Sequence, residues 1–213
     1  MWQVGASTPL RGYPPEATRA AIALLAKRLP QARIVLVASD KVLAEYAPLP
    51  LVGENVVACV GQPLRTVFAL ALQAACIVAP DSMLGHVAGG LGVPCVGLWS
   101  SFHPADRVKY YPGHVPLYHP VDCSPCRIHE CGEQKPGCPK PTGPWCKGLA
   151  AIEPGRIVDA VLSVLSAPPR ENSGPDWFSR RGASGAGNWT RGNHDRDRIA
   201  IGASGGRRVA AAG

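Results

Sequence analysis

Residues 76–99 read CIVAPDSMLGHVAGGLGVPCVGLW, and this stretch decides the fold. The apolar runs at 76–79 and 94–98 predict two strands, and the small residues at 83–91 between them predict a helix. Gly92 suits the left-handed residue that ends many helices. The order strand, helix, strand predicts two parallel strands joined by a crossover helix.

The same alternation continues through the first 100 residues. Further short apolar runs predict strands over 2–4, 34–38 and 56–60, and helical patterns between the runs cover 15–29, 41–46 and 64–75. The strands are apolar at nearly every position, which is typical of parallel sheets covered on both faces. We therefore predict an α/β fold, a single Rossmann-like domain with a parallel sheet of about five or six strands.

The chain changes character after this domain pattern. Residues 120–150 are rich in Pro, Gly and Cys and predict an irregular loop, and an apolar stripe over 153–166 predicts a closing helix. Residues 167–213 hold few large apolar side chains and predict a disordered basic tail beyond a folded unit of residues 1–166. A basic arm that binds RNA or membrane phosphates is the alternative, which the scattered arginines and the lack of lysine disfavour.

Composition, the N-terminal residues and the charge distribution limit the classes to which this protein can belong. Of 213 residues, 46% are hydrophobic, yet the chain has no run of 18 apolar residues, so we expect no membrane span. The N-terminus lacks the pattern of a secretory signal, which predicts a cytoplasmic protein with reduced thiols. The net charge of +7 comes mostly from eight arginines in the tail, so it carries little information about the folded part.

Asp81, Ser82 and His86 follow the strand predicted at 76–79 and begin the helix after it. The unpaired N–H groups of such a helix N-terminus attract anions at the carboxyl edge of a parallel sheet. The Ser82 hydroxyl can cap the helix or donate to a phosphate, and His86 lies on the same helix face one turn later. The alternatives are a simple N-cap role for Asp81 and a hydrogen-bonded core imidazole for His86.

This segment resembles the D-[ST]-G-x-x-H-x-A-x-x-x-G-x-P block of glycosyltransferase family 9, the heptosyltransferases. Residues 4–14, with Gly5-Ala6-Ser7 and then Arg11, look like the P-G-A-S segment of the family, which runs on to a basic residue and W-P. Residues 56–75 are similar to the stretch that precedes the Asp block. The resemblance covers about residues 2–165 in the same order.

The resemblance implies a GT-B fold, of which this chain would be the C-terminal half that binds a nucleoside-diphosphate sugar, typically ADP-heptose. It further implies that Ser7 and Arg11 approach the donor phosphates, that Asp81 holds a sugar hydroxyl and that Ser82 and His86 contact the diphosphate. The acceptor would be a lipid-linked saccharide of the lipopolysaccharide type, which suits a cytoplasmic protein at the surface of the inner membrane. The acceptor site and the catalytic base would lie in a separate N-terminal half, and the chemistry would require no cofactor and no nucleic acid.

Two departures from the family pattern keep other functions open, a Met in place of a Gly and an acceptor half that is expected on a separate segment. Met83 stands where the family has Gly, and a Met disfavours positive φ, so backbone approach to a diphosphate would be impaired. A non-catalytic nucleotide-sugar-binding or assembly module, or a truncated fragment, is therefore the alternative to a transferase domain. An epimerase-like relative would need carboxylates beside the sugar, and Asp40, Glu54 and Asp106 form no recognisable pattern.

Eight cysteines fall into two groups. Cys59, Cys76 and Cys95 lie in apolar runs and are expected to be small buried hydrophobes. Five more occur in the irregular loop, and their spacing allows a structural zinc site, free or redox-paired thiols, or an iron–sulfur cluster. The candidate zinc ligands are Cys123, Cys126, Cys131, Cys138 and Cys146.

Overall fold

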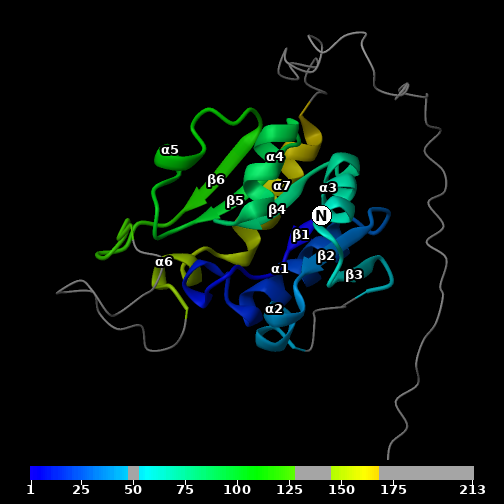
Figure 1. Cartoon of the computed structure of the whole chain (residues 1–213), viewed down its shortest axis with the longest axis horizontal. Coiled ribbons are helices and arrows are strands. Elements are labelled where there is room, and N and C mark those ends of the chain that lie inside the picture. The colour runs from blue at the N-terminus through cyan, green and yellow to red at the C-terminus, as the bar shows by residue number, and fades with distance from the viewer. Residues whose placement is uncertain (48–52, 128–144, 168–213) are drawn as a thin grey trace, which may run out of the picture. The chain divides into compact units, whose positions relative to one another are not determined.

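The computed structural model describes residues 1–47, 53–127 and 145–167, which form a parallel sheet with helices on both faces (Figure 1). The strands are β1 (Trp2–Gln3), β2 (Ile34–Ala38), β3 (Val56–Val60), β4 (Ile77–Pro80), β5 (Cys95–Trp99) and β6 (His114–Tyr118). They lie in the order β3-β2-β1-β4-β5-β6, and every pair is parallel. This is the strand order of a Rossmann fold, as the sequence predicts.

The helices follow the strands in the order that crossover connections require. They are the 3-10 helix η1 (Pro9–Arg11) and the α-helices α1 (Pro15–Arg28), α2 (Asp40–Glu45), α3 (Leu64–Gln73), α4 (Met83–Leu91), α5 (Pro104–Arg107), α6 (Lys147–Ala150) and α7 (Pro154–Ser166). Pro at the first position opens α1 and α7, where its missing N–H costs nothing. Gly92 ends α4 with φ 68°, in the left-handed region, as expected.

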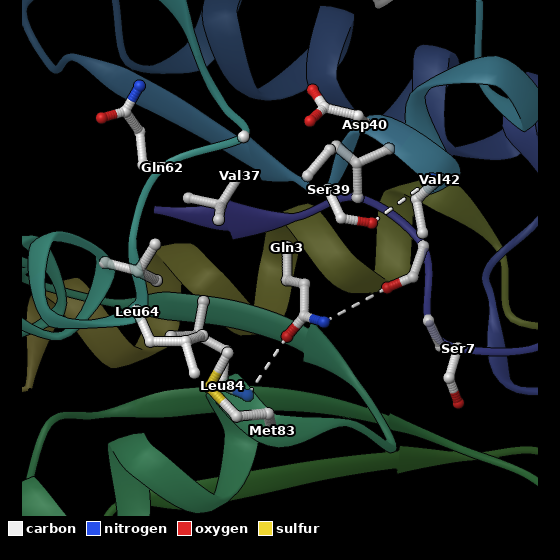
Figure 2. A pocket seen from close by; sticks show the side chains of 16 residues that line it. Gln3, Ser7, Val37, Ser39, Asp40, Val42, Gln62, Leu64, Met83 and Leu84 are labelled. Atoms are coloured by element: carbon white, nitrogen blue, oxygen red, sulfur yellow. Dashed lines mark hydrogen bonds between the residues drawn. The ribbon is translucent and has the colours of Figure 1, made fainter.

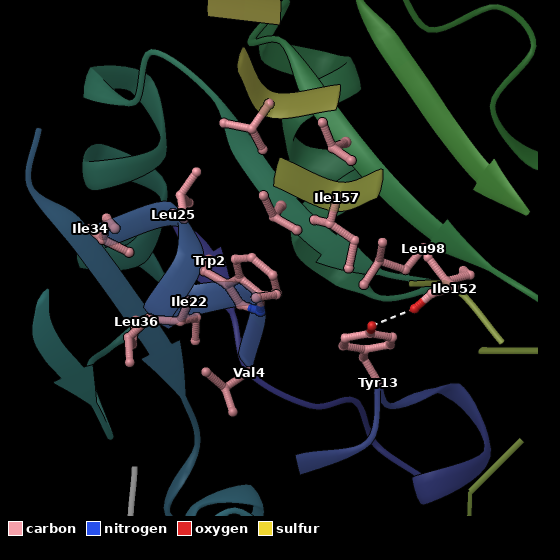
Figure 3. Packing of buried hydrophobic residues seen from close by; sticks show 14 of the residues in the cluster. Trp2, Val4, Tyr13, Ile22, Leu25, Ile34, Leu36, Leu98, Ile152 and Ile157 are labelled. Carbon is pink, nitrogen blue, oxygen red and sulfur yellow. Dashed lines mark hydrogen bonds between the residues drawn. The ribbon is translucent and has the colours of Figure 1, made fainter. Parts of the chain in front are cut away.

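Two apolar cores lie on the two faces of the sheet. Helices α1 and α7 pack together on one face, where Trp2, Ile22 and Ile157 are each at most 2% exposed (Figure 3). Helices α3 and α4 cover the other face around a smaller core that includes Ile77 and Leu84. Successive residues of a strand point to opposite faces of the sheet, so Leu36 packs in the first core and Val37 in the second.

The structure corrects several details of the sequence prediction. Strand β6 and the short helices α5 and η1 were not predicted, and α6 lies inside the segment 120–150 that was expected to be irregular. Cys76 and Cys95 are buried as expected, but Cys59 is only half-buried because β3 lies at the edge of the sheet. Burial raises the pKa of the Cys76 thiol to about 11, which keeps it in its neutral form.

Two of the predictions fall largely outside the described residues. These are the disordered tail at 167–213, of which only Ala167 is described, and the middle of the Cys-rich loop at 128–144. Among the helices that the structure describes, none is long and apolar enough to cross a membrane.

Candidate functional site

The strand order reverses between β1 and β4, which are neighbours in the sheet although β2 and β3 lie between them in sequence. The connections after β1 and β4 diverge at this point, since α1 covers one face of the sheet and α4 the other. In open α/β sheets, ligands bind at such a reversal, outside the carboxyl ends of the strands. The residues that follow β1 and β4 are therefore the candidate site.

The loop after β1 is shaped by Gly5 and delivers Arg11. Gly5 has φ 72°, and a Cβ at this position would overlap the side chains of Val42 and Tyr46, so the turn excludes larger residues. Helix η1 then turns the chain back, and Arg11 Nη1 donates to the carbonyl oxygen of Asp81 at 3.2 Å, whereas its Nη2 donates to the hydroxyl of Ser7. The structure thus brings Ser7 and Arg11 to the end of β4.

Asp81 lies at the centre of the candidate site. It is 5% exposed, and its Oδ1 lies 3.9 Å from Nε2 of His86, one turn into α4. Arg11 contacts its backbone and His86 faces its carboxylate, so three of the five residues expected to bind the donor lie together here. Ser82 follows directly, so all five sequence-predicted residues share this edge of the sheet.

Two buried polar atoms in this cluster have no hydrogen-bond partner among the described residues, namely Asp81 Oδ2 and Arg11 Nε. A buried acceptor or donor that stays unpaired costs about 1–3 kcal/mol, so proteins rarely leave such atoms without a partner. Here one orphan is a carboxylate acceptor and the other a guanidinium donor. A ligand that offers both a hydroxyl group and an anionic oxygen would satisfy both atoms.

Gln3 caps helix α4 from the neighbouring strand. It faces away from the core that holds Trp2, and its Oε1 accepts from the Leu84 N–H at 3.2 Å while its Nε2 donates to the Ser82 hydroxyl at 2.6 Å. Ser82 is the N-cap residue but makes no side-chain cap bond itself. The cap therefore comes from β1, and it ties the two segments of the site together.

Met83 does not adopt a positive φ, and its effect on the approach of a diphosphate stays a prediction. It is the first residue of α4, and Arg127 is the one non-glycine residue with positive φ in the part of the chain that the structure describes. The Met83 side chain is 38% exposed and lines a cavity beside the helix tip. The substitution for Gly thus changes the surface of the site rather than its backbone conformation.

Two aromatic rings pack against the side chain of His86 in α4. Trp99 of β5 and Tyr111, which precedes β6, each meet its ring edge to face. The hydroxyl of Tyr111 lies 3.1 Å from Nδ1 of His86, and the indole Nε1 of Trp99 donates to Nε2 of His114 at 3.2 Å. Burial, and to a smaller extent the nearby His86, lowers the pKa of His114 to about 4. His114 is therefore neutral at pH 7 and brings no positive charge to the site.

A cavity of about 470 Å³ opens at the ends of β1, β2 and β3, next to the tip of α4 (Figure 2). Leu64, Met83 and Leu84 give it an apolar wall, and Ser39, Asp40 and Gln62 add polar groups. Its volume lies within the range of small-molecule sites. Ser7 also lines the cavity and accepts from Arg11, so the cavity lies beside the Arg11–Asp81 cluster.

The described cysteines of the loop do not form a metal site by themselves. Cys146 is buried with its Sγ 2.7 Å from the hydroxyl of Ser100, at the end of β5, and no three of the described Cys, His, Asp or Glu residues are arranged to hold a metal ion. Cys131 and Cys138 lie outside the described residues, so structural zinc stays a prediction. The measurement for it is the zinc content of purified protein, expected at about one ion per chain.

Two residues of the site, Gln3 and Tyr111, were not predicted from the sequence, and Asp40 was considered only as an acid without a recognisable pattern. The signal for Gln3 was a lone amide between Trp2 and Val4 in an apolar strand, and the signal for Asp40 was its position directly after β2. Tyr111 left no signal, because its contact with His86 depends on how the chain returns from β5 to β6.

The strand order defines a Rossmann-type domain, and the candidate site lies at its strand-order reversal. The chain belongs to glycosyltransferase family 9 (heptosyltransferase), whose family model matches residues 19–136, more than half of the sequence. No curated protein matches the chain in sequence.

Two solved structures share the fold. ADP-heptose lipopolysaccharide heptosyltransferase II from E. coli is 23% identical, with a TM-score of 0.54. The glycosyl transferase of family 9 from Veillonella parvula DSM 2008 is 20% identical, with a TM-score of 0.55. In both comparisons the match covers 77% of this chain and 45% of the other, so the chain spans less than half the length of these relatives.

Proposed function

We propose that this domain binds a nucleoside-diphosphate sugar, ADP-heptose in the first place, as the donor for transfer to a lipopolysaccharide-type acceptor. The observation that carries the proposal is the convergence of Ser7, Arg11, Asp81, Ser82 and His86 beside a cavity at the strand-order reversal. Family membership supports the reaction class, and the similar E. coli enzyme carries ADP-heptose in its name.

The groups that line the cavity and the cluster suit the base, the ribose, the diphosphate and the sugar of such a donor, in that order. The cavity offers an apolar wall for a base, and Asp40 after β2 lies where Rossmann domains use an acid to bind ribose hydroxyls. The diphosphate would lie across the tip of α4, near Arg11 and His86, because helix N-termini and forked cations favour anions. Asp81 Oδ2 would then accept from a hydroxyl of the sugar.

In the transfer reaction, the acceptor hydroxyl gives its proton to a base and its oxygen bonds to the sugar carbon that carries the diphosphate. The bond from that carbon to the diphosphate breaks, and the nucleoside diphosphate leaves. The residues described here serve the second event, since Arg11, His86 and the α4 tip would stabilise the negative charge that develops on the leaving group. In the relatives that share the fold, the match with this chain covers only 45% of their length. We therefore expect donor binding without transfer by the 213-residue chain, and transfer to a lipid-linked saccharide once an N-terminal half joins it.

The test is calorimetry of the purified chain with ADP, UDP, GDP and ADP-heptose. We expect ADP-heptose to bind and Asp81→Ala to weaken it at least tenfold, because the variant removes the buried acceptor for the sugar. ADP, which lacks the sugar, should lose much less affinity in the same variant.

Arg11→Ala and Arg28→Ala form a matched pair for the phosphate part of the site. Arg28 ends α1, which runs from the carboxyl edge of the sheet to the opposite edge, so Arg28→Ala removes the same charge far from the site. We expect Arg11→Ala to weaken ADP at least tenfold and Arg28→Ala to leave it unchanged. Equal effects of the two variants, or no binding of any nucleotide at millimolar concentration, would contradict the proposal.

A further inference from the structure

We propose that Tyr111 is a positioning residue that holds the imidazole of His86 with its Nε2–H directed at Asp81 and at the diphosphate of the donor. This inference rests on the proposed function for the ligand that His86 meets. The orientation of the imidazole, however, belongs to the ligand-free protein and can be measured there.

The two nitrogens of His86 have different neighbours. Nε2 lies 3.9 Å from Oδ1 of Asp81, and Nδ1 lies 3.1 Å from the hydroxyl of Tyr111. A carboxylate can only accept, so the nitrogen that faces it is the one that carries a hydrogen. Nδ1 of the neutral ring is then an acceptor, and the Tyr111 hydroxyl, which can donate, fills that need. A hydroxyl can donate or accept, so the carboxylate at Nε2 and the hydroxyl at Nδ1 together favour the Nε2–H tautomer, which presents a donor to the anion site.

Tyr111 is itself held in place by its surroundings. Its ring meets the His86 ring edge to face, with centroids 5.9 Å apart and planes at 90°, and its N–H donates to Val108 O at 2.9 Å. The ring also fills the space above Gly89, where a Cβ would overlap it. Gly89 comes three residues after His86 on the same face of α4, so the helix provides both the imidazole and the gap for its partner.

The other groups around His86 do not compete for this role. Trp99 meets its ring edge to face at 6.5 Å, but the indole N–H is used by His114 Nε2. His114 is neutral at pH 7, and Arg11 contacts the backbone of Asp81. Among the described contacts of His86, Tyr111 is therefore the neighbour at Nδ1 that acts together with Asp81 at Nε2 to fix which nitrogen carries the proton.

The experiment compares Tyr111→Phe with Tyr110→Phe. Tyr111→Phe keeps the ring over Gly89 and removes only the hydroxyl, and Tyr110, with 83% of its surface exposed, is the matched control. The first readout is the pair of ¹⁵N shifts of the His86 imidazole in the ligand-free protein, assigned with His86→Asn. We expect the Nε2–H tautomer in the wild type and in Tyr110→Phe, and a mixture of tautomers in Tyr111→Phe.

The second readout is ADP affinity, which we expect to fall about five- to tenfold in Tyr111→Phe and not in Tyr110→Phe. An Nδ1–H tautomer in the wild type, or unchanged shifts in Tyr111→Phe, would overturn the inference, as would altered shifts with unchanged affinity. If the wild type binds no ADP, the proposed function fails, whereas the shifts still support or overturn the positioning of His86.

Discussion

At the scale of single residues, hydrogen bonds from buried tyrosines fix the loop that carries Arg11. Tyr13 donates from its hydroxyl to Ile152 O at 2.5 Å (Figure 3). Tyr46 donates from its hydroxyl to Tyr13 O, also at 2.5 Å. Burial raises the pKa of Tyr13, so its hydroxyl keeps its proton. The loop between β1 and α1 is thereby attached to the segment that precedes α7.

Tyr13→Phe should lower the free energy of unfolding by about 1–3 kcal/mol, because the variant leaves a buried carbonyl unpaired without creating a cavity. Chemical denaturation, monitored by tryptophan fluorescence, measures the change. Tyr110→Phe is the control and should change stability by less than about 0.5 kcal/mol, as expected for an exposed side chain. A Tyr13→Phe variant as stable as the wild type would show that Ile152 O finds another donor.

At the scale of the element, α4 has two adjacent glycines with opposite surroundings. A Cβ on Gly89 would overlap the Tyr111 ring, whereas a Cβ on Gly90 would meet no atom within 4 Å. The helix therefore needs the first glycine for packing, and the second only weakens it through its low helix propensity.

Gly90→Ala should stabilise the protein by about 0.5–1 kcal/mol, and Gly89→Ala should destabilise it, because the new methyl group forces the Tyr111 ring away. Thermal unfolding of the two variants, which add the same methyl group one residue apart, measures both effects. Equal shifts of Tm in one direction would contradict this reading of the helix.

Most elements could be predicted because their sequence patterns are local. The strands at 34–38 and 56–60 match the predicted ranges, and α1 and α4 begin where their Pro and Ser signals lie. Strand β6 could not be predicted, since Pro116 and the polar rings of His114 and Tyr118 interrupt its apolar pattern. It is an edge strand, where a proline is tolerated.

At the scale of the whole molecule, the site depends on contacts between distant segments. The sequence predicted Ser7, Arg11, Asp81, Ser82 and His86 from motif positions, and the structure brings them to one edge. The partners of these residues were beyond prediction, because Gln3 reaches Ser82 only through the pairing of β1 with β4, and Tyr111 reaches His86 only through the return to β6.

The stability of the whole domain should depend on pH through His114. Its pKa is about 4 in the folded protein and near 6.5 when unfolded, so the unfolded chain binds the proton more readily. The contribution of neutral His114 is complete above pH 6.5 and is lost as the pH falls toward 4. We expect this loss to be on the order of 1 kcal/mol, since the ring is only partly buried.

Denaturation at pH 7 and at pH 4.5 checks this expectation in the wild type and in His114→Gln. The variant keeps an acceptor for the Trp99 N–H but does not titrate. It should lose less stability than the wild type over this range, and parallel losses in the two proteins would show that His114 is protonated as easily in the folded state.

Strand β1 is only two residues long, yet it joins β3-β2 to β4-β5-β6 through Trp2 and Gln3. Its pairing with β4 links Trp2 to Val78, two residues that are far apart in the sequence. Contacts of such long sequence separation slow folding. We therefore expect β1 and β4 to pair late on the folding pathway. The candidate site, which lies at the ends of these two strands, would form in the same step.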